Sequence, residues 1–278
     1  MKISIFSLFR DSEPHLSRCL DQLKEVESST DVDFSYFFYE NDSTDDTEKI
    51  LRSWGKSRSF NLSCEKLNAP KYGSTLDPQR MILMSDIRNR MKNLDAEFDS
   101  DYSVIFDSDV SFDSNIINDF LNCKDLDFSM LTSNIRQNVP CKMGSNSEDS
   151  YYDSSILFDM DGTQCMTWSD NPFYRDGDIK LFNESKPVKV KRAFGSFAFL
   201  KSKAFKECEW KSQGESEHWS FCDRLRSIAP IYLIPSIRPF VEVSQKKWDH
   251  ESEVVKKQKW LLESKWNRFL WKTGSIRI

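Results

Sequence analysis

The sequence of 278 residues lacks the features that mark several common classes of protein. It has only eight glycines and no GxGxxG or Walker pattern, so no glycine-rich loop is available to cradle a phosphate group. Its formal net charge of −5 argues against a general nucleic-acid-binding protein, which would carry a basic excess. An anionic ligand is still compatible with this charge if a metal ion or local basic residues offset the repulsion.

The sequence also lacks paired cysteines and long apolar runs. Its seven cysteines are dispersed and form no CxxC pair, which is typical of reduced thiols in a cytosol-like compartment and not of a zinc site or a disulfide framework. The apolar run at the N-terminus, Ile3–Phe9, is short for a signal peptide. No stretch approaches the roughly 20 apolar residues of a membrane span. We therefore expect a soluble, cytoplasmic protein without a transmembrane segment.

Strand and helix patterns alternate through the first 110 residues. Apolar strand patterns at 3–9, 32–40 and 101–112 are separated by helical patterns at 13–27, 43–55 and 76–94. This alternation predicts βαβ units and an α/β fold with a mostly parallel central sheet flanked by helices.

The pattern loosens after residue 130. We expect a strand that enters a helix at 193–205, a helix at 216–228 and an extended segment at 231–243. A last helix over 249–272 carries an apolar stripe that favours packing on its own domain, although its Lys and Trp content leaves peripheral membrane contact as an alternative. We predict one domain over 1–278, with a regular half at 1–130 and a smaller, less regular half at 131–278.

Polar residues follow each of the three early strand patterns. In parallel sheets ligands bind at the carboxyl ends of the strands, so these residues are expected along one rim of the sheet. They are Phe9-Arg10, Glu40-Asn41-Asp42 and Asp107-Ser108-Asp109.

The segment Asp107-Ser108-Asp109 is a candidate metal site. Two carboxylates at positions i and i+2 can hold a hard divalent cation that keeps open positions for phosphate oxygens. The same pattern also arises as an ordinary acidic turn, as Asp99 and Asp101 illustrate. Its place at the end of an apolar strand favours the metal site, and Arg88 on the preceding helix could pair with a diphosphate on the same rim.

These segments together resemble a known class of enzyme. "FSYFFYENDSTDDT", "RMILMSDIRNRM" and "YSVIFDSDVSF" resemble the nucleotide-binding half of a GT-A glycosyltransferase. "YYDSSILFDMDG" and "GESEHWSFC" are similar to segments of the fungal capsule-associated (cryptococcal) α-mannosyltransferase family. The resemblance covers most of residues 1–225 and implies a GT-A (Rossmann-like) fold and transfer of a hexose to a hydroxyl group of a glycan acceptor. It also implies that residues 1–130 are the nucleotide-sugar-binding half and residues 131–278 the acceptor-binding half.

The resemblance implies roles for the residues of the rim. Glu40 would accept a hydrogen bond from the nucleotide base, Asp42 would lie near the ribose, and Arg10 would contact the nucleotide or its diphosphate. The donor would be GDP-mannose or, as a second choice, a UDP-hexose. Mn²⁺ or Mg²⁺ would be held by Asp109, assisted by Asp107.

The later part of the chain would supply the acceptor side. The resemblance places Glu217, and behind it Glu215, beside the acceptor. Glu217 would be a general base if the reaction inverts the anomeric centre, and a positioning group if it retains configuration. His250 would be a third metal ligand, and Gly195 with Ser196 would let the sugar approach the backbone closely.

Two other classes of function remain open. The stretch "SILFDMDGTQ" reads like the nucleophile strand of haloacid-dehalogenase-like phosphatases, with Asp159 as nucleophile and Asp161 as acid/base. That strand normally opens its domain, whereas here 158 residues precede Asp159, and the same loop could instead help to form the acceptor side with Tyr152 and Asp153. The second class is a sugar-binding module without catalytic activity.

Overall fold

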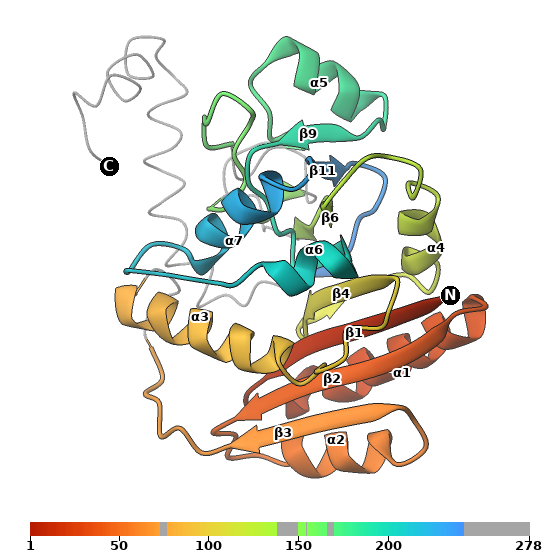
Figure 1. Cartoon of the computed structure of the whole chain (residues 1–278), viewed down its shortest axis with the longest axis vertical. Helices are drawn as coiled ribbons and strands as arrows, with labels where there is room; N and C mark the ends of the chain where they lie inside the picture. The colour runs from red at the N-terminus through yellow and green to blue at the C-terminus, as the bar shows by residue number, and fades with distance from the viewer. Residues whose placement is uncertain (73–76, 138–149, 154, 166–169, 242–278) are drawn as a thin grey trace, which may run out of the picture.

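An eight-stranded sheet runs through the molecule, with helices on both faces (Figure 1). The computed structural model describes residues 1–72, 77–137, 150–153, 155–165 and 170–241. The strands are β1 Lys2–Phe9, β2 Asp33–Asn41, β3 Phe60–Glu65, β4 Tyr102–Asp107, β5 Val110–Ser111, β6 Met130–Ser133, β7 Arg136–Gln137, β8 Ser150–Tyr151, β9 Val188–Val190, β10 Phe197–Lys201, β11 Ile231–Ile234 and β12 Phe240–Val241. The helices are α1 Glu13–Ser29, α2 Thr47–Gly55, α3 Pro78–Lys92, α4 Ile116–Leu121, α5 Asp176–Asn183, α6 Ser202–Glu207 and α7 Glu217–Arg226.

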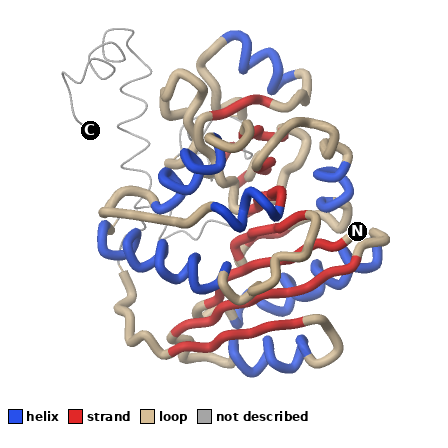
Figure 2. Tube along the Cα trace, in the orientation of Figure 1, coloured by secondary structure: helices blue, strands red, loops and turns tan. Residues whose placement is uncertain are grey.

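The main sheet has a parallel half and a mixed half. Its strand order is β3-β2-β1-β4-β10-β6-β11-β9, and the first four of these strands are mutually parallel. Strand β10 lies antiparallel between β4 and β6, so the sheet continues without a break into the second half of the chain. Strands β5, β12, β7 and β8 form a smaller second sheet. The predicted α/β class is confirmed, and Figure 2 shows the row of strands with helices around it.

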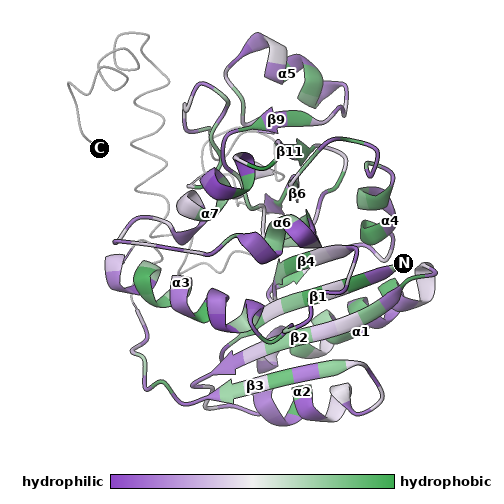
Figure 3. Cartoon of the chain, viewed as in Figure 1, coloured by the Kyte–Doolittle hydropathy of each residue, from purple (hydrophilic) through white to green (hydrophobic). Residues whose placement is uncertain are grey.

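The pleat of β2 divides the apolar core into two layers. Successive side chains of a strand point to opposite faces of the sheet. Phe38 accordingly packs with residues of α1 and α2, whereas Tyr39 packs with Ile87 of α3. The helices carry both apolar and polar residues (Figure 3). In α1 the buried residues recur every three or four positions, so they share the face that packs against the sheet.

Helix α3 has a well-defined start and a fixed position. The side chain of Asp77 caps its N-terminus by accepting from the backbone N–H groups of Gln79 and Arg80, and Pro78 suits the first turn. Further along, Asn89 exchanges two hydrogen bonds with the backbone of Trp210, at 2.8 and 3.0 Å. These hydrogen bonds hold α3 against the segment that precedes α7. They thereby fix which face of α3 is turned toward the sheet.

A tight turn precedes β10. Gly195 has a φ of +64°, and a Cβ atom there would lie 2.4 Å from the carbonyl oxygen of Ser133. We expect Gly195→Ala to lower the free energy of unfolding by about 2 kcal/mol, because the new methyl group both strains the backbone and overlaps its neighbours. Urea unfolding measures this loss. Gly177→Ala is the matched control: nothing lies within 4 Å of its Cβ position, and Ala favours helix α5, so stability should stay equal or rise.

The remaining predictions of secondary structure have different outcomes. The helices and strands expected up to residue 112 are present, but β3 was not predicted. The expected helix over 249–272 lies outside the described residues. Among the described residues, no helix combines the length and the apolar content that a membrane crossing requires. The six cysteines in this part of the chain are all free thiols.

Candidate functional site

A pocket of about 540 Å³ opens at the carboxyl ends of β1, β2 and β4. Arg10 follows β1, Asn41 ends β2, and Asp107 ends β4, and all three line the pocket. The inner face of α3 forms a further wall through Arg80 and Arg88. The pocket thus occupies the rim that the parallel strand order predicts for a ligand site, and its size is that of a small-molecule site.

Asp107 and Asp109 lie at the wall formed by the end of β4. The side chain of Asp107 is 35% exposed, and it lines the pocket together with Ser108 and Asp109. The surrounding protein raises the pKa of Asp107 because it disfavours the charged form, while Arg88 opposes this effect and Asp109 adds to it. Asp109 itself is exposed, so an oxygen of each carboxylate is available to a ligand in the pocket.

Arg88 is buried and bridges two carboxylates from distant parts of the chain. Its Nε donates to Glu217 Oε1 at 3.1 Å, and its Nη2 lies 3.7 Å from Asp107 Oδ1. Its guanidinium group also lies over the ring of Phe194, 5.1 Å from the ring centre. Arg88 therefore connects α3, α7 and the end of β4 while it lines the pocket.

Glu217 is 4% exposed and does not line the pocket. Burial alone would raise the pKa of Glu217, but the neighbouring His218 and Arg88, together with the hydrogen bond that Arg88 donates, outweigh this effect and lower it. Burial lowers the pKa of His218 to about 3, so His218 is neutral at pH 7 and Arg88 is the charge that keeps Glu217 ionised. The ring of His218 stacks on Phe194 with the ring centres 4.1 Å apart.

Asp153 follows Tyr152, which lines the pocket, and is a buried carboxyl group with a strongly shifted pKa. Its Oδ2 accepts the backbone N–H of Gly195 at 3.0 Å, and the residue is 9% exposed. Burial raises the pKa of Asp153 to about 7, and the negative charges of Asp107 and Glu217 add to this effect against the opposing charge of Arg88. Asp153 is therefore a carboxyl group that changes its charge close to neutral pH.

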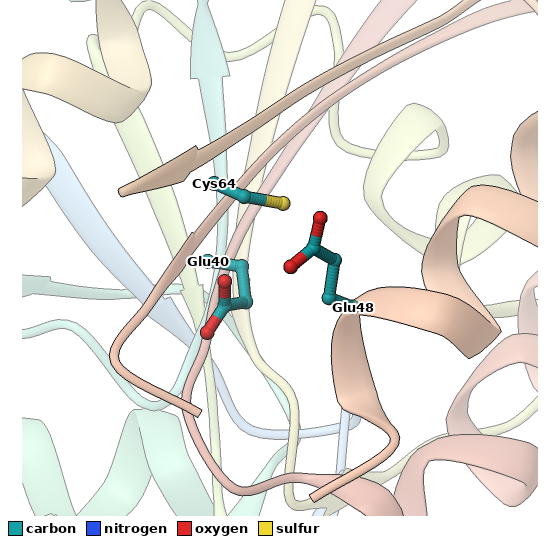
Figure 4. Close-up of side chains that lie close together, drawn as sticks. All are labelled: Glu40, Glu48 and Cys64. Atoms are coloured by element: carbon teal, nitrogen blue, oxygen red, sulfur yellow. The ribbon is translucent and has the colours of Figure 1, made fainter. Parts of the chain in front are cut away.

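The end of β2 places Glu40 and Asn41 on opposite faces of the sheet. Asn41 lines the pocket, whereas Glu40 does not and accepts the backbone N–H of Ser43 at 2.8 Å. Glu40 instead groups with Cys64 and Glu48, whose side chains point toward one another between the sheet and α2 (Figure 4). This cluster is explained without an ion.

Two effects limit the negative charge of this cluster. Arg52 donates to Glu48 at 2.8 Å and so offsets its charge. Burial raises the pKa of Cys64 to about 12, which keeps the thiol protonated.

Asp42 and Arg10 fix the segment that follows β3. Asp42 accepts the backbone N–H groups of Asn68 and Ala69 at 2.8 and 3.0 Å. Arg10 donates to the carbonyl oxygens of Ala69 and Pro70 at 2.7 and 3.3 Å. Burial opposes ionisation of Asp42, but these N–H donors together lower its pKa. Both side chains thus support the pocket wall next to Asn41.

The other residues predicted for the site lie around this pocket or apart from it. Phe9 and Ser108 line it, whereas Gly195 and Ser196 form the turn behind Asp107, where the carbonyl oxygen of Ser196 accepts the Asp107 N–H at 2.9 Å. Glu215 is exposed in the loop before α7 and accepts from the backbone of Gln213. The predicted metal ligand His250 lies outside the described residues.

The stretch with Asp159 and Asp161 forms a turn away from the pocket. Asp159 is 1% exposed, and its Oδ1 accepts the backbone N–H of Thr163 at 2.8 Å. Gly162 supplies the positive φ of +83° that the turn requires. Asp161 is exposed and pairs with Arg175. The DxDGT pattern is thus accounted for by turn geometry, because it ends no strand of the main sheet.

Several residues of the pocket were not predicted from the sequence. Arg80 and Lys71 add positive charge, and the Lys71 ammonium pairs with Asp11 at 2.7 Å. His15, which has no evident partner in the sequence, lines the pocket with its Nε2 3.4 Å from Ser108 Oγ. Of these three residues, only His15 could have been proposed from the sequence. It lies in the first turn of α1, directly after the end of β1, where the ligand site was expected.

The fold is that of the GT-A glycosyltransferases. The described chain superposes on S. aureus TarS residues 1–349 in complex with UDP with a TM-score of 0.51 and 14% identity, covering 89% of this chain and 62% of that chain. It superposes on GalNAc-T7 with UDP, GalNAc and Mn²⁺ with a TM-score of 0.54 and 9% identity, covering 89% of this chain and 45% of that chain. The chain therefore spans less than two thirds of each of these two solved proteins.

Within this class the chain belongs to a particular family. The family model described as cryptococcal mannosyltransferase 1 matches residues 2–227, which include every strand of the parallel half of the sheet and the whole pocket. The predicted membership is thus confirmed. No curated protein matches the chain.

Proposed function

We propose that this protein is a metal-dependent glycosyltransferase that moves a hexose from a nucleoside-diphosphate sugar to a hydroxyl group of a glycan. The observation that carries the proposal is the pair Asp107 and Asp109 at the end of β4, facing a pocket that also holds cationic side chains. Carboxylates for a metal and cations for phosphate oxygens are the two requirements for binding a diphosphate. The cations that line the pocket are Arg10, Lys71, Arg80 and Arg88.

The carboxylates suit a hard divalent cation. Mn²⁺ and Mg²⁺ prefer oxygen ligands, and Asp109 is exposed at the pocket while Asp107 presents a partly exposed carboxyl group beside it. We assign Asp109 as the principal ligand and Asp107 as the second. The cation would supply Lewis-acid stabilisation of the leaving diphosphate.

Arg88 and Glu217 are proposed to act together. The guanidinium group of Arg88 reaches the pocket, and the ionised Glu217 holds it from behind at 3.1 Å. Because Glu217 is buried and engaged by Arg88, we assign it as a positioning residue and not as the general base. Glu215 is left as an exposed candidate near the acceptor. Tyr152 lines the pocket and is proposed to face the acceptor.

The donor is proposed to be GDP-mannose, with a UDP-hexose as the second candidate. The family description favours mannose, whereas the solved relatives named above hold UDP. The pocket extends from the end of β2 to the end of β4, which are separated by β1 and therefore lie about 10 Å apart. An elongated nucleoside diphosphate can place its base at the first end and its phosphates at the second.

The test is a thermal-shift panel of GDP, UDP, ADP and CDP, each with and without Mn²⁺. We expect one nucleotide at about 100-fold above its Kd to raise the Tm by about 5 °C, only when Mn²⁺ is present. Asp109→Ala should abolish this shift because it removes the principal metal ligand. Asp99→Ala is the matched control, because Asp99-Ser100-Asp101 repeats the same pattern away from the pocket, and its response should equal that of the wild type.

Other outcomes separate the alternatives. No shift with any nucleotide would contradict the proposed function. Release of phosphate from simple phosphoesters, lost in Asp159→Asn, would instead support the phosphatase. Glycan binding that needs neither nucleotide nor Mn²⁺, and that survives Asp109→Ala, would support a sugar-binding module.

A further inference from the structure

Helix α1 carries a row of three polar side chains that follows the segment after β4. The members of the row lie at positions i, i+3 and i+7, which share one side of a helix. Each of them contacts a later point of the segment 108–112, so the helix and this segment are held side by side. The three contacts join His15 Nε2 to Ser108 Oγ at 3.4 Å, Arg18 Nη2 to the carbonyl oxygen of Asp109 at 2.9 Å, and Gln22 Nε2 to the carbonyl oxygen of Phe112 at 2.6 Å.

The two carboxylates of the proposed metal site are held in different ways. Asp107 is the last residue of β4, where it pairs in register with Leu8 of β1 and donates its N–H to the carbonyl oxygen of Ser196 at 2.9 Å. Asp109 lies two residues later, in the exposed turn between β4 and β5. Because its side chain extends from a turn and not from the sheet, the direction of its carboxylate depends on how the backbone of this turn is held. The hydrogen bond from Arg18 holds that backbone.

The contact from Arg18 is suited to this task. A charged guanidinium group forms stronger hydrogen bonds than a neutral donor, and its planar fork limits the directions in which it can donate. Arg18 donates to the backbone of Asp109 and not to its carboxylate, so it does not compete with a cation for that carboxylate. Arg18 is itself exposed and takes no part in the apolar core.

The charge of Arg18 has the opposite effect on the same site. A positive charge beside Asp109 repels a cation that this residue would bind. On Coulomb grounds alone, removal of Arg18 should therefore strengthen the binding of a divalent cation. If Arg18 holds the turn in the geometry that binding requires, its removal should weaken that binding. The two effects differ in sign, and a measured metal affinity separates them.

We propose that Arg18 is a positioning residue for the metal site and that the hydrogen bond to the Asp109 carbonyl outweighs the repulsion by its charge. His15 and Gln22 support the same segment on either side of this contact. Helix α1 thus sets the geometry of a cation site whose ligands, Asp107 and Asp109, both lie outside it. The inference rests on the proposed function, because it concerns the cation which that function requires.

The experiment measures the affinity of the full chain for GDP and for UDP by calorimetry over a series of Mn²⁺ concentrations. The quantity of interest is the Mn²⁺ concentration at which nucleotide binding is half developed. We expect Arg18→Met to raise this concentration about tenfold, at the lower end of the effects that follow the loss of a supporting contact at a metal site. At saturating Mn²⁺ the variant should bind the nucleotide as tightly as the wild type does.

Two further variants control for charge and for the substitution. Lys24→Met removes a positive charge from an exposed position of the same helix, where Lys24 pairs with Asp21, and it should leave the Mn²⁺ dependence unchanged. Arg18→Lys should lie between the wild type and Arg18→Met, because an ammonium group keeps the charge and a donor but not the planar fork. Arginine, lysine and methionine have similar helix propensities, so none of these changes should unfold α1.

Each remaining outcome has a distinct meaning. If Arg18→Met needs the same Mn²⁺ concentration as the wild type, or a lower one, the inference is overturned while the proposed function stands. If Arg18→Met weakens nucleotide binding by the same factor at every Mn²⁺ concentration, Arg18 supports the pocket in general and the inference is again overturned. If neither nucleotide binds to the wild type at any Mn²⁺ concentration, the proposed function fails, and the inference fails with it.

Discussion

Arg88→Met is expected to lower the free energy of unfolding by about 3–5 kcal/mol. Removal of the guanidinium group leaves the carboxylate of Glu217 buried without its 3.1 Å partner, and it removes the charge that opposes the raised pKa of Asp107. The replacement keeps a side chain of similar length against Phe194, so the loss reports charge more than packing. Urea unfolding at pH 7 measures it.

A double-mutant cycle separates the ion pair from other effects. Glu217→Gln removes the charge that Arg88 neutralises, so Arg88→Met should cost at least 1 kcal/mol less in the Glu217→Gln background. Arg88→Lys should be intermediate, because one ammonium group cannot replace a planar guanidinium group that faces both Glu217 and Asp107. Additive losses in the cycle would show that the pair contributes nothing beyond its separate residues.

The parallel half of the fold could be predicted from local periodicity. The helical pattern of 76–94 puts Met81, Met84, Ile87 and Met91 on one face, and all of these except Met84, which lines the pocket, are buried in α3. Strand β3 could not be predicted in the same way, because Phe60–Glu65 has no fully buried residue and mixes polar with apolar side chains. Its strand structure comes from pairing with β2, which is a tertiary contact.

The place of Asp107 and Asp109 at the pocket could be predicted because its signal is local: an apolar strand is followed at once by two carboxylates. The residue at the end of β2 could not, because the choice between Glu40 and Asn41 depends on which face of the sheet α2 covers. A shift of one residue along a strand exchanges the two faces. The resemblance points to an acidic residue at this loop, and only the pleat shows that the amide of Asn41 faces the pocket.

The contacts behind the pocket are not local at all. Arg88 and Glu217 are 129 residues apart in the chain, and Asp153 and Gly195 are 42 apart. The sequence offers Glu217 as a carboxylate at a helix start, which is correct for α7. It gives no indication that Arg88 engages this carboxylate, since that depends on how α3 and α7 pack.

Asp153→Asn is expected to stabilise the protein at alkaline pH and to leave its stability nearly unchanged at pH 4. Burial raises the pKa of Asp153 from 3.8 to about 7 in the folded state, so the folded protein binds this proton more tightly than the unfolded chain does. Between pH 3.8 and about 7, Asp153 is ionised in the unfolded chain but still protonated in the folded protein. The free energy of unfolding therefore falls as the pH rises through this range. Above pH 7 the full penalty is present, and a change from 3.8 to about 7 corresponds to about 4 kcal/mol.

Asparagine keeps the shape of the protonated carboxyl group and can still accept the N–H of Gly195 at the position where Asp153 does so at 3.0 Å. The gain in stability over the wild type should therefore appear between pH 4 and 7 and reach a plateau near pH 8. Urea unfolding at pH 5, 6, 7 and 8 follows it. Asp21→Asn, at an exposed aspartate of α1, controls for the substitution itself. If the difference in stability between Asp153→Asn and the wild type does not change with pH, then Asp153 is ionised in the folded protein over this whole pH range. In that case the positive charge of Arg88 outweighs both the burial and the negative charges of Asp107 and Glu217.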